Sequence, residues 1–385
     1  MRGAHGAIAL AGCFMLGCGS SGTTTCFTDG GVDAGADTGF HTAAHGAFPQ
    51  ATDAGGPVLV NPALVTVTFP GYALEQQVQT YDTFLAGSDW LATIGKDYGV
   101  GAGTATQVVL ASAAPSSLTD DDVEQLLQAR IGDQTLPSPT ADTLYVVYIP
   151  VGTDETDFAG YDDCGAAQGH IVGGYHWEST AQGAPFAYAV VSSCQGQSLS
   201  DLELAASHEI AEGATDPFPA SNPAWGIADP KNPWHYDNSE LADLCVLQTT
   251  TEQGNTLSRI WSNSAAAASR DPCQPVPAGA LPYFNASLTP TTLQTAPAGS
   301  AITYQLTGWS LGPVPDWGLS VVLSPYATFF PTTALDRGTL NNGETATLTI
   351  IIPPGASSGS QAGLLVYSEL QADESAYWLA AVQVQ

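Results

Sequence analysis

The chain has 385 residues, of which 44% are hydrophobic, enough apolar material for one large domain or two to three ordinary ones. Only 11% are charged, and 7 Lys and Arg stand against 37 Asp and Glu, for a net charge of −30. So few cations cannot neutralise many phosphates, which excludes nucleic acid and anionic membrane surfaces as main partners. The 41 glycines and 26 prolines exclude an all-helical bundle and indicate a loop-rich protein that contains β-structure.

The first 18 residues have the pattern of an export signal, an arginine followed by a short apolar run. The run is too short to span a bilayer, and it resembles a bacterial lipoprotein signal, in which the cysteine after the cleavage site is lipidated. Cys13 follows the better lipobox but leaves a very short signal, whereas Cys18 gives a more usual length, so we predict Cys18 as the anchor. The expected location is the bacterial cell envelope, as an outer-membrane lipoprotein, or the extracellular space.

Residues 19–56 are small, polar and rich in glycine, which predicts a flexible tether. Strand and helix signals alternate over residues 57–280, which predicts an α/β or α+β domain. Strands are expected at 64–69, 106–110, 143–149, 170–177 and 186–193, and helices at 73–85, 88–98 and from a Thr119 cap onward. Residues 281–385 alternate without helix signals between Gly, Pro and Asn turns, which predicts an antiparallel, immunoglobulin-like β-sandwich.

Four cysteines lie in the predicted α/β domain, and in an oxidising compartment they indicate disulfides. Four cysteines allow three pairings. The two local bonds, Cys164–Cys194 and Cys245–Cys273, each close a loop of about 30 residues, worth roughly 3 kcal/mol. A zinc–thiolate site is disfavoured because no CxxC spacing occurs.

The segment SDLELAASHEIAEGATDP, residues 200–217, carries the candidate chemistry. Ser200 and Glu203 have capping-box spacing, and Gly213 and Pro217 are expected to weaken or stop the helix after Asp216. His208 and Glu212 are four residues apart and share a helix face, with Glu209 beside them. This is the geometry of the HExxH metallopeptidase helix, with Glu212 in place of the second histidine.

Zinc held by such a helix lowers the pKa of a bound water from about 15.7 to about 7. Glu209 is then the predicted proton acceptor. We predict Glu240 as the third metal ligand and Asp243 as the acceptor that orients His208. The reverse assignment of these two acids and His235 as a ligand are alternatives.

The chain resembles bacterial secreted relatives of the EXORDIUM/phosphate-induced family. The resemblance is carried by the motifs SHEIAEGATDPF, ELADLC and RIWSN and a final cysteine, in this order. The same family is resembled by four motifs upstream of these, TVTFPG, LYVVYIP, GGYH and AYAVV. The resemblance therefore covers residues 60–275. It implies a common fold and site without a firm activity. At the level of the motif the site resembles zincin peptidases, although a set of one histidine and carboxylates also suits calcium or manganese.

In a zincin-like domain, His176 of GGYH is expected near the cleft, where it would stabilise an oxyanion. Residues 261–263 would either do the same or shape the pocket. The sequence therefore predicts a surface-anchored zinc metallopeptidase with a protein or peptide substrate. The alternative is a non-catalytic adhesive or carbohydrate-binding lipoprotein, with a structural metal helix and a glycan bound by the C-terminal domain.

Overall fold

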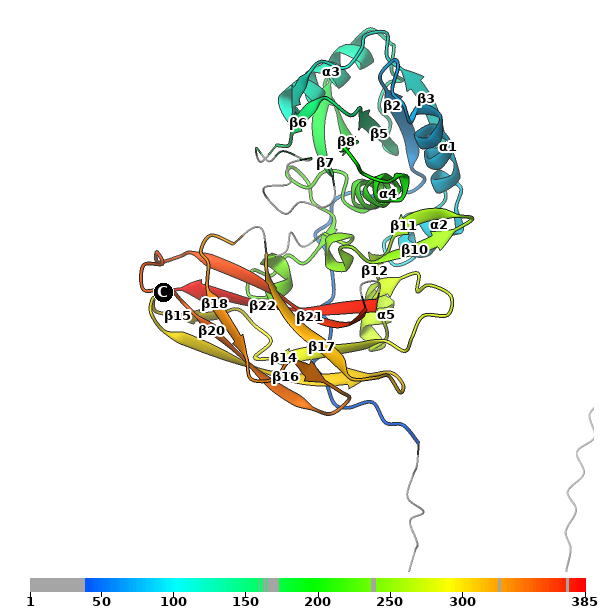
Figure 1. Ribbon diagram of the computed structural model, residues 1–385. Helices are drawn as coiled ribbons and strands as arrows, with labels where there is room; N and C mark the ends of the chain where they lie inside the picture. Colours follow the sequence, from blue (N-terminus) through cyan, green and yellow to red (C-terminus); the bar gives the residue numbers. More distant parts are fainter. Residues whose placement is uncertain are drawn as a thin grey trace, which may run out of the picture. The chain divides into compact units, whose positions relative to one another are not determined.

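The computed structural model describes residues 39–158, 160, 162, 164, 173–236, 240–324, 327–371 and 374–385. Cys18 and the signal lie outside the described residues. Residues 40–385 form one compact unit of mixed α/β structure in which strands outnumber helices (Figure 1). Within the described residues, none of the helices combines the length and hydrophobicity that a bilayer crossing requires.

The N-terminal half of this unit is built on a five-stranded sheet. Its strands are β2 (Ala63–Thr68), β3 (Thr104–Val109), β5 (Thr143–Ile149), β7 (Gly174–Ala181) and β8 (Ala184–Ser192). They lie in the order β3-β2-β5-β8-β7, and all neighbours are parallel except the edge strand β7, which is antiparallel to β8. All seven residues of β5 are buried, because this central strand is covered on both faces.

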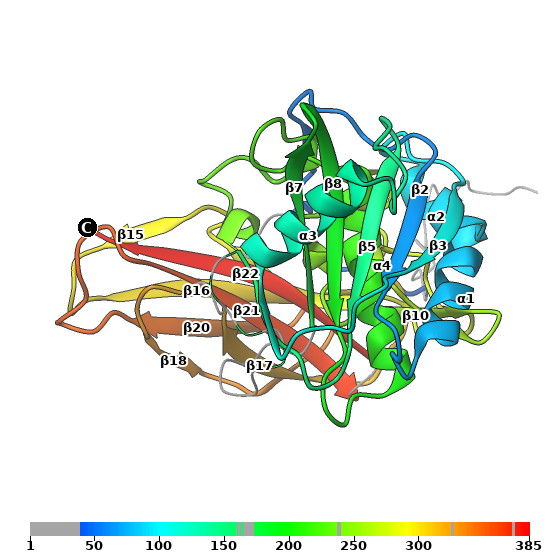
Figure 2. The same cartoon turned by 90° about the horizontal axis from the view of Figure 1, so that it is seen from above.

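Helices cover both faces of the sheet. The helix α3 (Asp120–Gly132) packs through Val123, Leu127 and Ile131 on one face (Figure 2). The helices α1 (Glu75–Ala86), α2 (Asp89–Gly95) and α4 (Leu199–Thr215) contribute to the core on the other face. The predicted strands at 64–69, 106–110, 143–149 and 186–193 and the helices α1 and α3 are thereby confirmed, with small shifts at their ends. The strand predicted at 170–177 is observed as β7, from Gly174 to Ala181, and residues 170–172 lie outside the described residues; the helix predicted at 88–98 is the shorter α2.

The helix α4 begins earlier than predicted. Its N-cap is Ser198, which forms a capping box with Asp201, so the prediction of Ser200 and Glu203 in these roles is wrong. The Glu203 carboxylate instead accepts the backbone N–H of Thr256 at 2.8 Å. Gly213 also lies inside α4 and does not end it. A Cβ at this position would lie 2.9 Å from Cδ1 of Leu144, so the glycine lets the helix lie close to β5.

Further short elements lie before, between and after the strands of this sheet. They are β1 (Thr52–Asp53), β4 (Ser117–Thr119), β6 (Asp154–Thr156), β9 (Trp225–Gly226), η2 (Pro233–Tyr236), η3 (Asp243–Cys245), β10 (Thr249–Glu252), β11 (Asn255–Ser258), β12 (Ile260–Trp261), α5 (Asn263–Ala267) and β13 (Cys273–Gln274). The predicted disulfides Cys164–Cys194 and Cys245–Cys273 are both present, which confirms the local pairings.

The C-terminal strands form two further sheets, ordered β14-β16-β20-β18 and β15-β22-β21-β17-β19. The sheets pack on each other, and the Tyr304 hydroxyl of β16 donates to the carbonyl of Ala381 in β22 at 2.8 Å. All neighbouring strands are antiparallel except β15 and β22, which are parallel. The strands are β14 (Phe284–Thr289), β15 (Gln294–Ala296), β16 (Ala301–Ser310), β17 (Trp317–Leu323), β18 (Thr332–Leu335), β19 (Thr339–Leu340), β20 (Thr345–Ile351), β21 (Gln361–Gln371) and β22 (Glu374–Val384).

The prediction of a flexible tether is wrong for residues 40–56. Phe48 is 6% exposed, stacks on Trp378 with ring centroids 5.1 Å apart, and meets Trp261 edge-on at 5.6 Å. The backbone N–H of Ala51 donates to the side chain of Asn263. Phe48 thus enters a pocket of tryptophans, and its burial adds to the backbone contacts that hold this segment.

Candidate metal site

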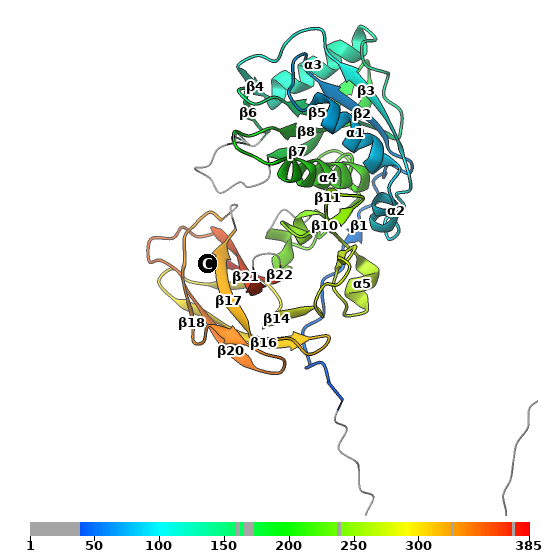
Figure 3. The same ribbon diagram turned by 45° about the vertical axis from the view of Figure 1, so that its right-hand side comes forward.

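The chemistry-bearing residues of α4 lie on its buried middle turns, against β7 and β8 (Figure 3). His208, Glu209 and Glu212 are all buried. His208 and Glu212 lie one turn apart, and Nε2 of His208 is 3.2 Å from Oε1 of Glu212. The predicted helix therefore brings an imidazole and a carboxylate together on one face, as the i, i+4 spacing requires.

Asp243, at the start of η3, joins this pair. Its Oδ1 lies 3.1 Å from Nε2 of His208, and its backbone N–H donates to Oε1 of Glu212 at 3.1 Å. The Tyr377 hydroxyl donates to the carbonyl of Asp243, and the disulfide of Cys245 anchors the same short helix. One donor atom from each of His208, Glu212 and Asp243 lies within 4.8 Å of the others.

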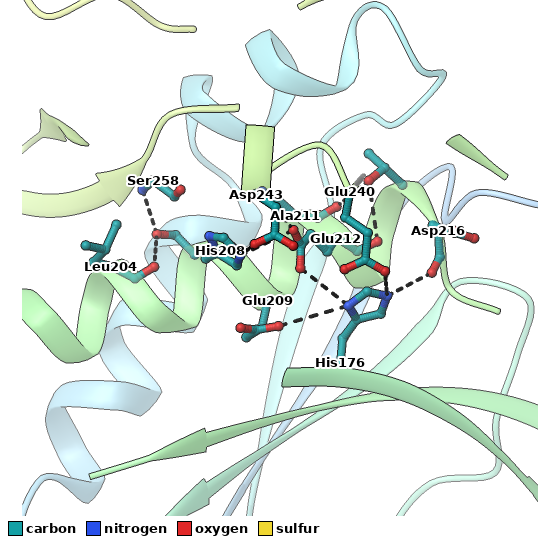
Figure 4. Close-up of polar contacts among 12 residues, drawn as sticks. His176, Leu204, His208, Glu209, Ala211, Glu212, Asp216, Glu240, Asp243 and Ser258 are labelled. Carbon is teal, nitrogen blue, oxygen red and sulfur yellow. Dashed lines mark hydrogen bonds and ion pairs between the residues drawn. The ribbon is translucent and has the colours of Figure 1, made fainter. Parts of the chain in front are cut away.

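His176 enters the same cluster from the edge strand β7 (Figure 4). Its Nε2 donates to the backbone carbonyl of Asp216, the C-cap of α4, at 3.1 Å. Its Nδ1 faces Oε2 of Glu212 at 3.5 Å and Oε2 of Glu209 at 4.0 Å. Oε1 of Glu240 lies 3.8 Å from Nε2 of His176. His176, Glu209 and Glu212 form a second group whose donor atoms lie within 4.8 Å of one another.

A glycine brings β7 close to α4. A Cβ at Gly174 would lie 2.9 Å from Cγ of Glu209 and 2.9 Å from the carbonyl oxygen of Val190. Both distances are shorter than side-chain carbons tolerate, so the residue two positions before His176 must be small. The GG pair of the GGYH motif is the sequence signal for this close approach.

The cluster consists of two imidazoles and four carboxylates, those of His176, His208, Glu209, Glu212, Glu240 and Asp243. The side chains of His176, Glu209 and Glu212 are at most 4% exposed. The Glu240 and Asp243 side chains are 18% and 19% exposed, so solvent reaches the cluster from the side of residues 240–243. Ionised carboxylates in such surroundings require cations nearby, and protons or a metal ion can meet that need.

The pKa shifts follow from this crowding. Burial opposes charge on His176, but the Glu240, Glu212 and Glu209 carboxylates outweigh burial and raise its pKa to about 10. The pKa of His208 rises for the same reason, with Glu212 as its main partner. Burial raises the pKa of Glu209 and of Glu240 well above the usual range. Glu212 responds in the opposite direction, because His208 and His176 overcome burial and lower its pKa.

The other predicted residues lie as follows. Glu240, predicted as third ligand, lies beside His176, whereas Asp243, predicted to orient His208, is the acid that meets both His208 and Glu212. His235 is held by the carbonyl of Ile227 and belongs to neither group. Trp261 is buried in the core, Ser262 caps α5, and the Asn263 side chain bonds Ala51.

The donor set of imidazole nitrogens and carboxylate oxygens fits zinc or manganese. Every member of the cluster could be predicted from its residue type and spacing in the sequence, whereas the position of His176 beside both Glu209 and Glu212 could not. That placement depends on β7 lying beside β8 in the part of the sheet that α4 covers.

Comparisons with known proteins give weak structural similarities. No protein-family profile and no curated protein matches the chain. Among solved structures, a family 123 glycoside hydrolase from Clostridium perfringens is similar over 24% of this chain and 22% of its own, at 12% identity and a TM-score of 0.18. This chain therefore spans about a fifth of that enzyme.

Two further similarities are also weak. WR4, an MSP family member of C. elegans, is similar over 26% of this chain and 97% of its own, at 11% identity and a TM-score of 0.20. A nucleoside hydrolase-related hypothetical protein from Saccharophagus degradans is similar over 84% of this chain and 100% of its own, at 10% identity and a TM-score of 0.29. Scores this low carry no argument about function.

Proposed function

We propose that this protein is a zinc-dependent hydrolase that is anchored at the bacterial cell surface and cleaves peptide bonds in protein or peptide substrates. The observation that carries the proposal is the meeting of His208, Glu212 and Asp243, two from one helix face and one from a loop fixed to that helix. This arrangement keeps the spacing of the HExxH helix and adds an acid from later in the chain.

The sheet supports the same proposal. A mostly parallel sheet with an antiparallel edge strand, followed by a buried helix that carries the metal-binding residues, is what a zincin-like domain requires. Among the described residues, β7 pairs with β8 alone, so its other edge offers backbone groups to an extended peptide. The two packed C-terminal sheets would then form the proposed immunoglobulin-like domain.

Zinc in this cluster would supply a Lewis acid that polarises the peptide carbonyl and acidifies water. The His208, Glu212 and Asp243 side chains would hold the ion. Glu209 would accept the proton of the attacking water, because it follows His208 directly on α4 and its Oε2 lies 4.0 Å from His176 in the same cluster; burial raises its pKa. Solvent and substrate would enter from the side of Glu240 and Asp243, the two partly exposed members of the cluster.

Export and anchoring belong to the same proposal. The two disulfides fit an oxidising compartment. The lipid anchor at Cys18 remains a prediction from the signal sequence, and mass spectrometry of the mature N-terminus from a bacterial host would test it.

The decisive experiment measures metal content and peptide cleavage on the same purified protein. The Glu209→Gln variant should keep one equivalent of zinc, measured by mass spectrometry, and lose on the order of 10² to 10⁴ in kcat against casein or fluorogenic peptides. Glu75→Gln on α1, outside the cluster, is the matched control and should cleave normally.

Full activity of Glu209→Gln would overturn the role given to that residue. Protein that binds no divalent metal and cleaves nothing would overturn the proposal as a whole. If such protein also bound a glycan array, the carbohydrate-binding alternative would replace it.

A further inference from the structure

His176 lies against α4, beside Glu209 and Glu212, and the function proposed above gives it no role. We propose that His176 is a metal ligand through Nδ1, and that β7 thereby supplies the second imidazole that the HExxE helix lacks. This inference rests on the metal site proposed above, and it assigns to His176 a role different from the oxyanion contact expected from the sequence.

The hydrogen bond of His176 to Asp216 selects the ring tautomer. A carbonyl oxygen only accepts hydrogen bonds, so Nε2 of His176 carries the proton. In the neutral ring the lone pair is therefore on Nδ1. Histidines that bind metals commonly donate their other ring N–H to a carbonyl or carboxylate in this manner.

The surroundings of Nδ1 call for a cation. Nδ1 faces Oε2 of Glu212 at 3.5 Å and Oε2 of Glu209 at 4.0 Å. A lone pair that points at two carboxylate oxygens is repelled by them unless a positive charge lies between. A proton meets that need in the metal-free chain, and a divalent ion would meet it with twice the charge.

Glu212 links the two histidines. Its Oε1 faces His208 and its Oε2 faces His176, so the carboxylate lies between two imidazoles from different elements (Figure 4). His176 and His208 belong to two groups of donor atoms that share Glu212, so an ion that joined the two groups would bind Glu212 and an imidazole nitrogen from each. Two nitrogens and a carboxylate favour zinc over calcium, which takes oxygen donors almost exclusively.

Nuclear magnetic resonance of the full chain loaded with ¹¹³Cd²⁺ tests this role directly. With ¹⁵N-labelled histidine, a nitrogen bound to cadmium shows a one-bond coupling that a histidine nearby does not show. We expect two coupled imidazole nitrogens in the natural protein, one from His208 and one from His176.

The His176→Gln variant should lose one of these couplings and keep the other, since glutamine retains an N–H donor for the Asp216 carbonyl but has no imidazole. Its zinc affinity, measured by competition with a chelator, should fall by more than about tenfold, the smallest loss typical of residues that only orient a ligand. His235→Ala removes a histidine outside the cluster and should change neither readout. Thermal unfolding of each variant establishes that it is folded.

The outcomes separate this inference from the proposed function. A single coupling that persists in His176→Gln would overturn the inference and leave the metal site standing. Absence of any coupling, together with absence of zinc binding, would overturn both.

Discussion

The backbone N–H of Asp243 donates a hydrogen bond to Oε1 of Glu212, at 3.1 Å, across 31 residues of sequence. This bond joins a loop to the helix α4 through a main-chain group. As a result, the Asp243 backbone is held against α4, at a position from which its carboxylate lies 3.1 Å from His208. The third donor of the proposed site is therefore positioned before any ion binds, and positioning of this kind lowers the cost of binding.

Asp243→Ala should lower zinc affinity by more than about tenfold, because it removes Oδ1 and keeps the backbone bond to Glu212. Glu240→Ala is the comparison, since Oε1 of Glu240 lies 3.8 Å from His176. Competition with a chelator measures both. A larger loss in Glu240→Ala would restore the ligand assignment predicted from the sequence.

Gly174→Ala should destabilise the fold by about 1–3 kcal/mol, the usual cost of overpacking. The added Cβ would lie 2.9 Å from Glu209 and from the Val190 carbonyl, so strand, helix or both must shift. Gly338→Ala is the control, because nothing lies within 4 Å of its added Cβ. Urea unfolding measures both variants, and equal stabilities would show that β7 and α4 are less tightly packed than described.

Asp82 should make the protein less stable as the pH rises. Its carboxyl is fully buried under the sheet, accepts hydrogen bonds from Thr66 and Tyr148 at 2.6 Å each, and burial raises its pKa from 3.8 to about 7. The folded state therefore keeps this proton between pH 4 and pH 7 while the unfolded state loses it. The stabilisation is complete below pH 4 and is lost as the pH rises toward 7.

Between pH 5 and pH 7.5 this loss amounts to about 2–3 kcal/mol, at 1.36 kcal/mol per pH unit. Denaturant unfolding at the two pH values, in the natural protein and in Asp82→Asn, isolates the contribution. The variant should lack that part of the pH dependence. Identical pH dependence in the two proteins would contradict the assignment.

Phe48→Ala should cost about 3–5 kcal/mol of stability, as for other buried phenylalanines. The ring fixes residues 40–56 among Trp261, Trp309 and Trp378. Phe40→Ala is the matched control, because this phenylalanine of the same segment is 42% exposed. Limited proteolysis should cut the Phe48→Ala protein near the N-terminal segment. If both variants resist protease equally, other contacts hold the segment.

The local patterns in the sequence predicted much of the structure. The apolar run TLYVVYI became the buried strand β5, and Thr119 became the cap of α3. The i, i+4 spacing of His208 and Glu212 was enough to place them together, because helix geometry is set within one turn. Both disulfides followed from cysteines about 30 residues apart.

The tertiary structure decided what surrounds that helix turn. His176 meets Glu212 only because β7 is the edge strand against α4, and Asp243 meets His208 only because its loop bonds the helix. Phe48 is buried for a similar reason, since its pocket is made of tryptophans more than 200 residues away. Local spacing fixes which side chains share a face, whereas strand order and loop docking, which depend on packing of the whole chain, fix what that face meets.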